Sequence, residues 1–550
     1  MGILIILMPL VIYLIVALAG KKVKINHPDD YFSAFRKVGE TEFTSSSVAY
    51  GFQVSTIYPF LFWGASMFLF VPFVNAIFWG IGILLFYLSF NKISKYLGKG
   101  KTLHGLIGKT YGNKARVVAS YLTILGFVGY IIAELWFGSR VLLAVFPSNN
   151  WIYFSAFIFV FFISIYLFKE GQISSIKTDQ LQLVFTYLGV FGIIIYLLYA
   201  TFKNRQEISG ALNWGLLIII VLAFLILFIR KLKFIKIYSA IDNILNIVVS
   251  LLFASIIILG VMLLFNNGSN FQLGNFVNLE GFGYLGLISL IILPLSWQFV
   301  DLTNWQRILS VKKDKSEIVN RSIKKGLLTF SIESPFTWIL FLIFGLLIST
   351  AYSNLTFEDI LIDFPKQMIN SESTFETAIG YTFIVSIISI MLSTIDSFIM
   401  GIAFTYTYDI NSKSKELIDK NDTLNKNQLD GILAKGKIFG FITVLLSIGL
   451  FVVFDKYVKG GGDLFINLLL TFYTASLSFL PLVLGLIFLK KRPSENWAIS
   501  SMLIGSVISI SLGVYAVIFN PEYAWYPIIV CTILSGFIYL IGTLSSKNKL

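Results

Sequence analysis

The chain has 550 residues, of which 57% are hydrophobic and 13% are charged, with a formal net charge of +13. The charged share is about half that of an ordinary globular domain, which excludes a soluble enzyme and an intrinsically disordered chain. One cysteine excludes a disulfide scaffold, and with only two histidines it leaves little for a structural zinc site.

Apolar segments occupy most of the chain. A spanning helix needs roughly 20 mainly apolar residues, and about fifteen segments approach or exceed that length. They lie at about 2–19, 46–66, 68–90, 117–146, 151–168, 178–201, 213–229, 238–265, 283–305, 326–350, 377–408, 438–454, 464–489, 497–519 and 525–544. The sequence therefore predicts an all-α polytopic membrane protein, a single membrane domain over residues 1–550, whose function lies inside the helix bundle.

Basic residues predict the orientation of the chain. Lys21, Lys22 and Lys24 directly follow the first segment, and no basic residue precedes it. A secretory signal has the opposite arrangement, so this segment is predicted to be an uncleaved anchor with its N-terminus outside. Alternating sides from there places most of the 42 lysine and arginine residues in inner loops, which predicts a cytoplasmic C-terminus in the plasma (inner) membrane. The net charge is then a basic fringe along the membrane, and no nucleic-acid partner is expected.

The segment at 46–66 contains residues that weaken a helix. Gly51–Thr56 combines a glycine with β-branched residues, and Pro59 and Gly64 follow. Helices break inside membranes where their backbone lines a cavity and offers carbonyl oxygens to ligands. The pattern predicts a broken helix at a binding site, and a proline kink without a ligand is the alternative.

Several acidic residues fall within or near apolar segments. They are Glu134, Asp179, Asp242, Asp301, Glu333 and Asp396. A charge in the hydrocarbon core is costly, so such residues indicate function unless they lie at a wet end of a segment. Asp396 lies in the middle of its segment, whereas a wet or interfacial position is the alternative for Asp179, Asp242, Asp301 and Glu333.

Ser393–Ser397 is the densest polar cluster within an apolar segment. On a helix, Ser393, Asp396 and Ser397 share one face. Three oxygen-bearing side chains on one buried face suit a hard monovalent cation. A helix-packing face whose hydroxyls bond to the backbone is the alternative.

Pro294–Gln298 places aromatic and amide side chains next to each other in the segment at 283–305. Trp297 and Gln298 are predicted to line a substrate cavity, as a stacking platform and a hydrogen-bonding group. An aromatic belt at the membrane interface is the alternative.

In this order, these residues resemble the sodium/solute symporter family, which includes sodium–galactose and sodium–proline symporters. The resemblance runs from about Asp30 to the last segment and is that of a divergent member. Its signatures are Asp30-Tyr31-Phe32 with Arg36, Thr102-Leu103 through Arg116, Gly171 through Gln182, Asn304-Trp305-Gln306-Arg307 with Leu309, Ser393–Ser397, and Thr407-Tyr408-Asp409-Ile410.

The resemblance implies a leucine-transporter-type fold, an inverted repeat of five plus five core helices with extra helices around it. It divides the chain into an N-terminal anchor and loop (1–45), a first core half (46–201), a second core half (282–489) and C-terminal peripheral helices (490–550). The region between the halves (202–281) departs from the family and is predicted to be an inserted helical hairpin.

The family's central sodium site implies two hydroxyls and three backbone carbonyls in this chain. They would come from Ser393, Thr394, Gly51, Val54 and Ile390. Na⁺ is therefore the expected bound ion.

A second sodium site, present in some members of the family, would map to Asp179, Ser393, Asp396 and Ser397. Asp396 supplies a carboxylate at a position of this site where a hydroxyl group would be sufficient as a sodium ligand. A carboxylate strengthens a cation site or, equally, admits a proton.

Substrate contacts in the family come partly from the first core helix, where this chain has Gln53, Ser55 and Thr56. The sequence around Arg140 is similar to that of proline- and pantothenate-type carriers. Arg140 would attract a substrate carboxylate, and an anchor near the outer face is the alternative.

Taken together, these features predict a sodium-coupled secondary transporter, not an enzyme, that imports an amino acid, a carboxylate or another small polar solute by alternating access. The expected partners are the solute, the sodium ion and the lipid bilayer, and no oligomeric state follows from the sequence. Alternatives are a proton-coupled symporter of the same fold, a non-transporting membrane sensor and a membrane enzyme.

Overall fold

The computed structural model describes residues 2–18, 24–66, 68–96, 102–204, 283–311, 317–351, 360–420, 424–457 and 461–546. Every named element in these ranges is a helix, and one isolated parallel bridge joins Val38 to Val311. The hairpin predicted at 213–229 and 238–265, together with Asp242, lies outside the described residues.

The helices before residue 205 are α1 (Gly2–Leu18), α2 (Pro28–Phe32), α3 (Glu40–Tyr50), α4 (Val54–Ala65), α5 (Phe70–Ile93), α6 (Leu103–Tyr111), α7 (Asn113–Arg140), the short η1 (Val141–Ala144), α8 (Asn149–Glu170) and α9 (Gln172–Asn204). Those after residue 282 are α13 (Gly283–Val300), α14 (Leu302–Ser310), α15 (Glu317–Ala351), α16 (Ile360–Ile369), α17 (Thr374–Thr405), the π-helical η3 (Tyr406–Ile410), α18 (Ser412–Lys420), α19 (Lys426–Tyr457), α20 (Gly461–Leu477), α21 (Leu480–Phe488), α22 (Glu495–Ile518), the short η4 (Pro521–Trp525) and α23 (Tyr526–Ser545).

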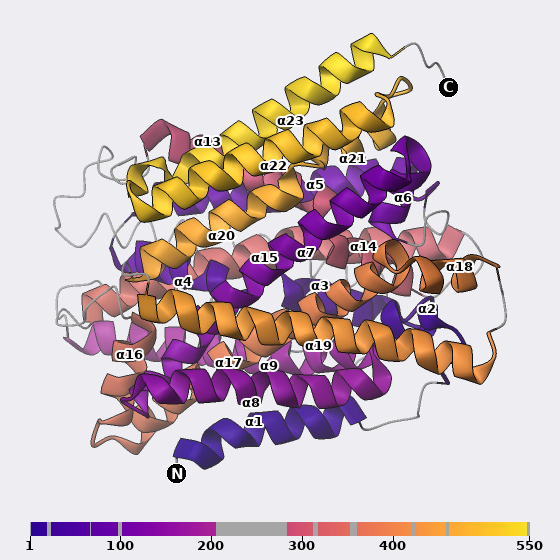
Figure 1. The fold of residues 1–550 in the computed structure, drawn as a ribbon. Coiled ribbons are helices and arrows are strands. Elements are labelled where there is room, and N and C mark those ends of the chain that lie inside the picture. Colours follow the sequence, from indigo (N-terminus) through magenta and orange to yellow (C-terminus); the bar gives the residue numbers. More distant parts are fainter. Residues whose placement is uncertain are drawn as a thin grey trace.

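Ten helical segments in the described part of the chain are long and apolar enough to cross a membrane. Every span predicted within those ranges falls on a helix or on two consecutive helices, which confirms a multi-pass, all-helical membrane protein. In Figure 1 the long helices lie side by side, and α1 begins at the end of the bundle opposite to the end where α23 finishes.

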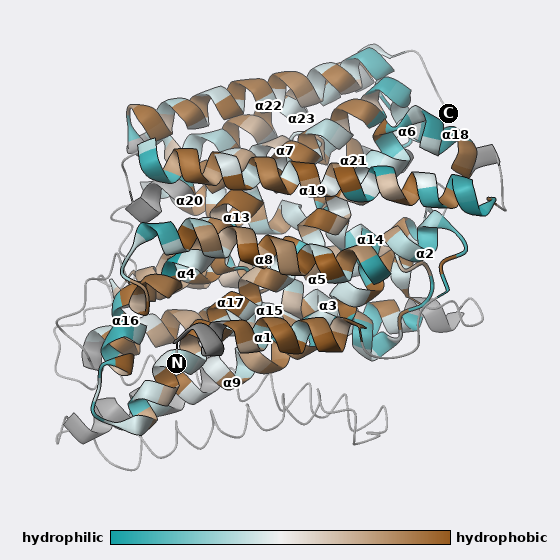
Figure 2. Cartoon of the chain, turned by 60° about the horizontal axis from the view of Figure 1, so that its bottom comes forward, coloured by the Kyte–Doolittle hydropathy of each residue, from teal (hydrophilic) through white to brown (hydrophobic). Residues whose placement is uncertain are grey.

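The outer faces of the bundle are apolar. Leu88, Val507 and Ile533 are 64%, 59% and 62% exposed, a pattern that suits contact with lipid tails. Figure 2 shows hydrophobic residues along the shafts of the helices and hydrophilic ones gathered at their ends, for example on α6 and α18. The hydrophobic surface therefore forms a belt between two polar rims.

Two helices are interrupted inside the bundle. The helix predicted to break at 46–66 does so: α3 ends at Tyr50, residues 51–53 are not helical, and α4 begins at Val54. The second break, between α13 and α14, was not predicted from the sequence. Asp301 causes it by capping α14, since its carboxylate accepts hydrogen bonds from the Thr303 amide at 2.9 Å and the Thr303 hydroxyl at 2.6 Å.

Two glycines let α4 and α15 cross with their backbones in contact. A Cβ atom added to Gly64 would lie 2.0 Å from the Leu342 carbonyl oxygen, and one added to Gly345 would lie 2.0 Å from the Leu61 carbonyl oxygen. No real side chain tolerates such distances. This contact fixes the second half of the broken helix against α15.

We expect Gly345→Ala to lower the free energy of unfolding by about 1–3 kcal/mol, because the added methyl group forces the two backbones apart. Gly449→Ala is the matched control, since nothing lies within 4 Å of the corresponding position on α19. Thermal unfolding of the purified proteins in detergent measures the difference. Equal melting temperatures for the two variants would contradict this crossing.

Candidate functional site

Glu134, on α7, holds the start of α4 at the break. Its Oε2 atom accepts the Val54 amide at 3.0 Å, and its Oε1 atom accepts the Ser55 amide at 2.9 Å and the Ser55 hydroxyl at 2.5 Å. Glu134 is fully buried, and no basic side chain in the described ranges lies within ion-pair distance of it. The N-terminus of a helix attracts negative charge, and here the protein itself supplies that charge.

The carbonyl oxygens exposed by the break also have partners from other helices. The Trp338 indole of α15 donates to the Gly51 carbonyl at 2.9 Å. The Thr394 hydroxyl of α17 lies 3.4 Å from the Phe52 carbonyl and 3.1 Å from the Ile390 carbonyl. A hydroxyl and several carbonyl oxygens therefore converge where α17 passes the break.

These contacts bear on the residues predicted to form a central sodium site. The structure brings Thr394 against the break and against Ile390, and it places Gly51 and Val54 on the two sides of the break. Ser393 lies next to Thr394 on α17 and donates its hydroxyl to Asp179 Oδ1 at 2.7 Å. Among the described residues there is no group of three histidine, cysteine or acidic side chains that suits a transition metal.

A buried arginine, Arg307 of α14, lies among the residues predicted to form a second sodium site. Its Nη2 atom lies 3.6 Å from Asp179 Oδ2 and donates to the Ser397 hydroxyl at 2.7 Å. Its Nε atom donates to the Ser46 hydroxyl at 2.9 Å, and its guanidinium covers the Tyr50 ring at 4.3 Å. One side chain that is 1% exposed thereby connects α3, α9, α14 and α17.

Asp396 is paired with hydroxyl groups. Tyr166 donates to its Oδ2 atom at 2.8 Å, and Ser175 donates to its Oδ1 atom at 2.7 Å. Thr178 and Ser397 lie farther away, at 3.2 and 3.3 Å from the carboxylate. Each carboxylate oxygen of Asp179 and Asp396 thus already accepts a hydrogen bond in this conformation.

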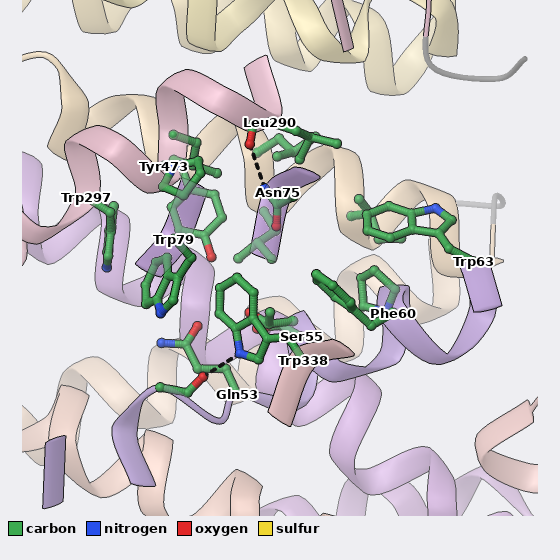
Figure 3. A pocket seen from close by; sticks show the side chains of 18 of the residues that line it. Gln53, Ser55, Phe60, Trp63, Asn75, Trp79, Leu290, Trp297, Trp338 and Tyr473 are labelled. Carbon is green, nitrogen blue, oxygen red and sulfur yellow. Dashed lines mark hydrogen bonds between the residues drawn. The ribbon is translucent and has the colours of Figure 1, made fainter. Parts of the chain in front are cut away.

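A cavity opens on the α4 side of the break, where water-molecule centres could occupy about 70 Å³. One buried water requires roughly 10–15 Å³, so the cavity has room for a small solute. Gln53, Ser55, Thr56 and Trp297, all predicted to contact substrate, line it. Figure 3 shows Gln53 and Ser55 close to the Trp338 ring, with Trp63, Trp79 and Trp297 around the rest of the space.

Two other residues predicted to contact substrate do not line the cavity. Gln298 follows Trp297 on α13 and therefore points about 100° away from it; its side-chain oxygen accepts a hydrogen bond from Asn304 at 2.7 Å. Arg140 lies over the Trp136 ring at 4.5 Å. The structure does not bring either residue to the cavity wall.

The sequence signatures at 30–36 and 304–309 pack against each other. The Gln306 side chain donates to the Phe32 carbonyl, and the Arg36 amide donates to the Leu309 carbonyl at 3.2 Å. The adjacent Val38 amide donates to the Ser310 carbonyl at 2.9 Å. These contacts attach the chain before α3 to α14, beyond the second break.

A second pair of signatures meets around Asp409. Its carboxylate accepts the Thr102 hydroxyl at 2.8 Å and the Arg116 guanidinium at 2.6 Å. It also lies 3.3 Å from the His104 ring, whose other nitrogen contacts Thr123 at 2.8 Å. This cluster fixes α6 and α7 to the end of α17 and explains why these motifs occur together.

Sequence reasoning assigns no partner and no role in the site to three residues that organise it. Glu134 was recognised as a buried carboxylate but was given no partner, although the backbone amides it accepts lie at the predicted break. Arg307 lies just beyond the end of an apolar segment, where a basic residue looks interfacial. Nothing in the sequence distinguishes Trp338 from the many other aromatic residues of the chain.

No protein-family model matches the sequence, and no curated protein matches it. Among solved structures, a Na⁺-coupled sialic acid symporter in a substrate-bound outward-open state has a similar fold, with a TM-score of 0.64 and 14% sequence identity over 100% of this chain and 98% of that one. A weaker likeness, with a TM-score of 0.47 and 11% identity over 96% and 98% of the chains, is to a nucleobase–cation symport family transporter in a closed conformation with bromovinylhydantoin bound. The chain therefore has the fold of a membrane transporter.

Glu134→Gln is expected to loosen the start of α4, because a neutral amide interacts less favourably with a helix N-terminus than a carboxylate does. We expect a lower melting temperature, corresponding to about 1–3 kcal/mol, and loss of any stabilisation by sodium. Glu376→Gln is the control, since Glu376 contacts Tyr196 and Ser371, away from the break. An unchanged response to sodium in Glu134→Gln would show that the carboxylate does not support the site.

Proposed function

We propose that this protein is a sodium-coupled secondary transporter that moves a small organic solute across the membrane by alternating access. The observation that carries the proposal is the break between α3 and α4, where carbonyl oxygens meet the hydroxyl of Thr394 beside a cavity of solute size. Broken helices of this kind supply ion and substrate ligands in transporters.

The inverted repeat implied by the sequence resemblance supports this proposal. In that scheme α3 and α4 together form core helix 1, α13 and α14 form core helix 6, and α17 is core helix 8. Helices 1 and 6 are the first helices of the two repeats, and both are interrupted. A repeated interruption is expected when both halves contribute unwound backbone to one central site.

Sodium, as cargo, would bind between Ser393 and Thr394 of α17 and the carbonyls of Gly51, Val54 and Ile390. The Ser393 hydroxyl proton points to Asp179, which leaves the lone pairs of its oxygen available to a cation. The Glu134 carboxyl group of α7, which has no basic partner in the described ranges, bonds to the first two amides of α4 and favours a cation at the break.

Coupling between ion binding and solute binding would follow from residues that the two sites share. Ser55 bonds to Glu134 and also lines the cavity, so the ion site and the solute site share the start of α4. A cation that orders this segment thereby prepares the cavity wall, and each ligand raises the affinity of the other by the same factor. An inward-negative potential would add about 2.3 kcal/mol per translocated charge per 100 mV.

Arg307 would serve as a lock on the side of the break away from the cavity. Its partners Ser46 and Tyr50 belong to α3, whereas the cavity is lined by α4. Closing that side requires α3, α9, α14 and α17 to stay together, and opening it requires this network to separate. The second sodium site stays a prediction, and an ion at Asp179 and Ser397 would have to displace Arg307.

Proton coupling is a second candidate, favoured by the environment of Asp396. Hydroxyl groups surround this carboxylate, and Asp179 is a second buried acid bonded to the neighbouring Ser393. Uptake that ignores sodium but follows an imposed pH gradient would establish this candidate in place of sodium coupling.

The double variant Ser393→Ala and Thr394→Ala is expected to abolish the stabilisation that sodium, but not potassium, gives at equal ionic strength. Two of the proposed ligands are removed while the helix is retained. Thr377→Ala with Thr382→Ala is the control, because these hydroxyls on the same helix bond to their own backbone. A sodium response that survives in the double variant would refute this assignment of the site.

The lock is testable by cysteine labelling. The single native cysteine, Cys531, is buried. The labelling rate of a Ser45→Cys reporter on α3 can therefore be compared with that of Cys531 in the same protein. We expect Arg307→Ala to speed labelling of the reporter by roughly tenfold or more, since loss of one partner from a buried ion pair costs about 3–5 kcal/mol. Cys531 should stay unlabelled, which excludes general unfolding. An unchanged labelling rate would contradict the lock.

A further inference from the structure

Aromatic side chains form a large part of the cavity wall. Five tryptophans, a tyrosine and a phenylalanine line it, namely Trp63, Trp79, Trp297, Trp338, Trp525, Tyr473 and Phe60. No acidic, basic or histidine side chain belongs to the lining in the described part of the chain. Figure 3 shows rings from several helices facing one space from different directions. A solute bound there would contact aromatic faces from several directions.

Four polar groups that line this cavity are engaged by the protein. The indole N–H groups of Trp79 and Trp338 donate to Ser334 at 3.0 Å and to the Gly51 carbonyl at 2.9 Å. The Asn75 amide donates to the Leu290 carbonyl at 2.8 Å, and the Ser55 hydroxyl donates to Glu134. These four donors are therefore not available to an anionic solute in this conformation.

The electrostatic field around the cavity favours positive charge. Glu134 lies directly behind Ser55, and its carboxylate occupies the backbone amides that would otherwise attract an anion. Asp179, Asp301, Glu333 and Asp396 are further buried acidic side chains of the bundle. Arg307 is the one lysine or arginine that is fully buried in the described ranges, so buried acidic side chains outnumber buried basic ones there.

We propose that the solute is a small organic cation whose ammonium nitrogen carries alkyl groups. Such a cation has no strong need for hydrogen-bond acceptors, and aromatic faces stabilise it through their quadrupoles. The buried carboxylates supply the opposite charge without contacting the ligand. This preference for a cation rests on the cavity itself, and its role in transport rests on the proposed function above.

Three probes of nearly equal shape test the proposal, namely choline, its neutral carbon analogue 3,3-dimethylbutan-1-ol and the anion 3,3-dimethylbutanoate. Binding to the purified full-length protein is measured by calorimetry in saturating sodium. We expect choline to bind, the alcohol to bind roughly tenfold or more weakly, which is about 1.4 kcal/mol, and the anion not to bind. Equal or tighter binding of the alcohol, binding of the anion, or no binding of any probe would overturn the proposal.

Variants of Trp79 distinguish a cation–π contribution to choline binding from a contribution of packing. Trp79→Phe and Trp79→Leu both remove the bond to Ser334, but only the phenylalanine keeps an aromatic ring. We expect the leucine variant to bind choline roughly 2- to 30-fold more weakly than the phenylalanine variant, with no such difference for the alcohol. Trp151→Leu, at an exposed position away from the cavity, should bind choline as the unaltered protein does. Equal losses for both probes would show that the ring acts through packing alone.

Repeating the choline titration in potassium separates the two proposals. Choline affinity that is the same in sodium and potassium would support the cation-binding cavity and contradict sodium coupling. Sodium-dependent binding of a neutral or anionic solute would support sodium coupling and contradict the cation-binding cavity.

Discussion

A polypeptide inside a bilayer must satisfy its own backbone hydrogen bonds, because no water reaches them in the hydrocarbon core. The break between α3 and α4 is stable only because three other helices supply partners. Glu134 accepts the amides that begin α4, and Trp338 and Thr394 donate to carbonyls that no helix satisfies. The site is thus built from groups whose first role is to make an interrupted helix possible.

The same constraint places the proposed ion site, the cavity and the Arg307 network around one break. A carboxyl group is buried at the N-terminus of α4 beside the break, and on the other side the Phe52 carbonyl faces Thr394 of α17 while the Gly51 carbonyl accepts from Trp338 of α15. Arg307 lies 3.6 Å from Asp179 on the α3 side of the break and bridges four helices. The cavity and the Arg307 network therefore lie on opposite sides of the break, an arrangement that suits the proposed alternating access.

The multi-pass helical fold and the break at 51–53 followed from hydropathy, glycine and β-branched residues, because these signals are local. The cluster at 393–397 was also visible, since a polar run inside an apolar segment is conspicuous. The residues that contact the break and this cluster from other helices could not be predicted from the sequence. Glu134 is separated from Ser55 by 79 residues and Arg307 from Ser397 by 90, so only the packed structure brings them together. The second break escaped notice because a single aspartate, Asp301, produces it.

Hydrogen–deuterium exchange of the peptide over residues 50–58, in sodium and in potassium at equal ionic strength, tests the central claim most directly. If a cation binds at the break, the amides of Val54 and Ser55 should exchange more slowly in sodium, while peptides from α22 and α23 stay unchanged. Identical exchange in the two salts, at every concentration, would contradict a sodium site formed by this interrupted helix.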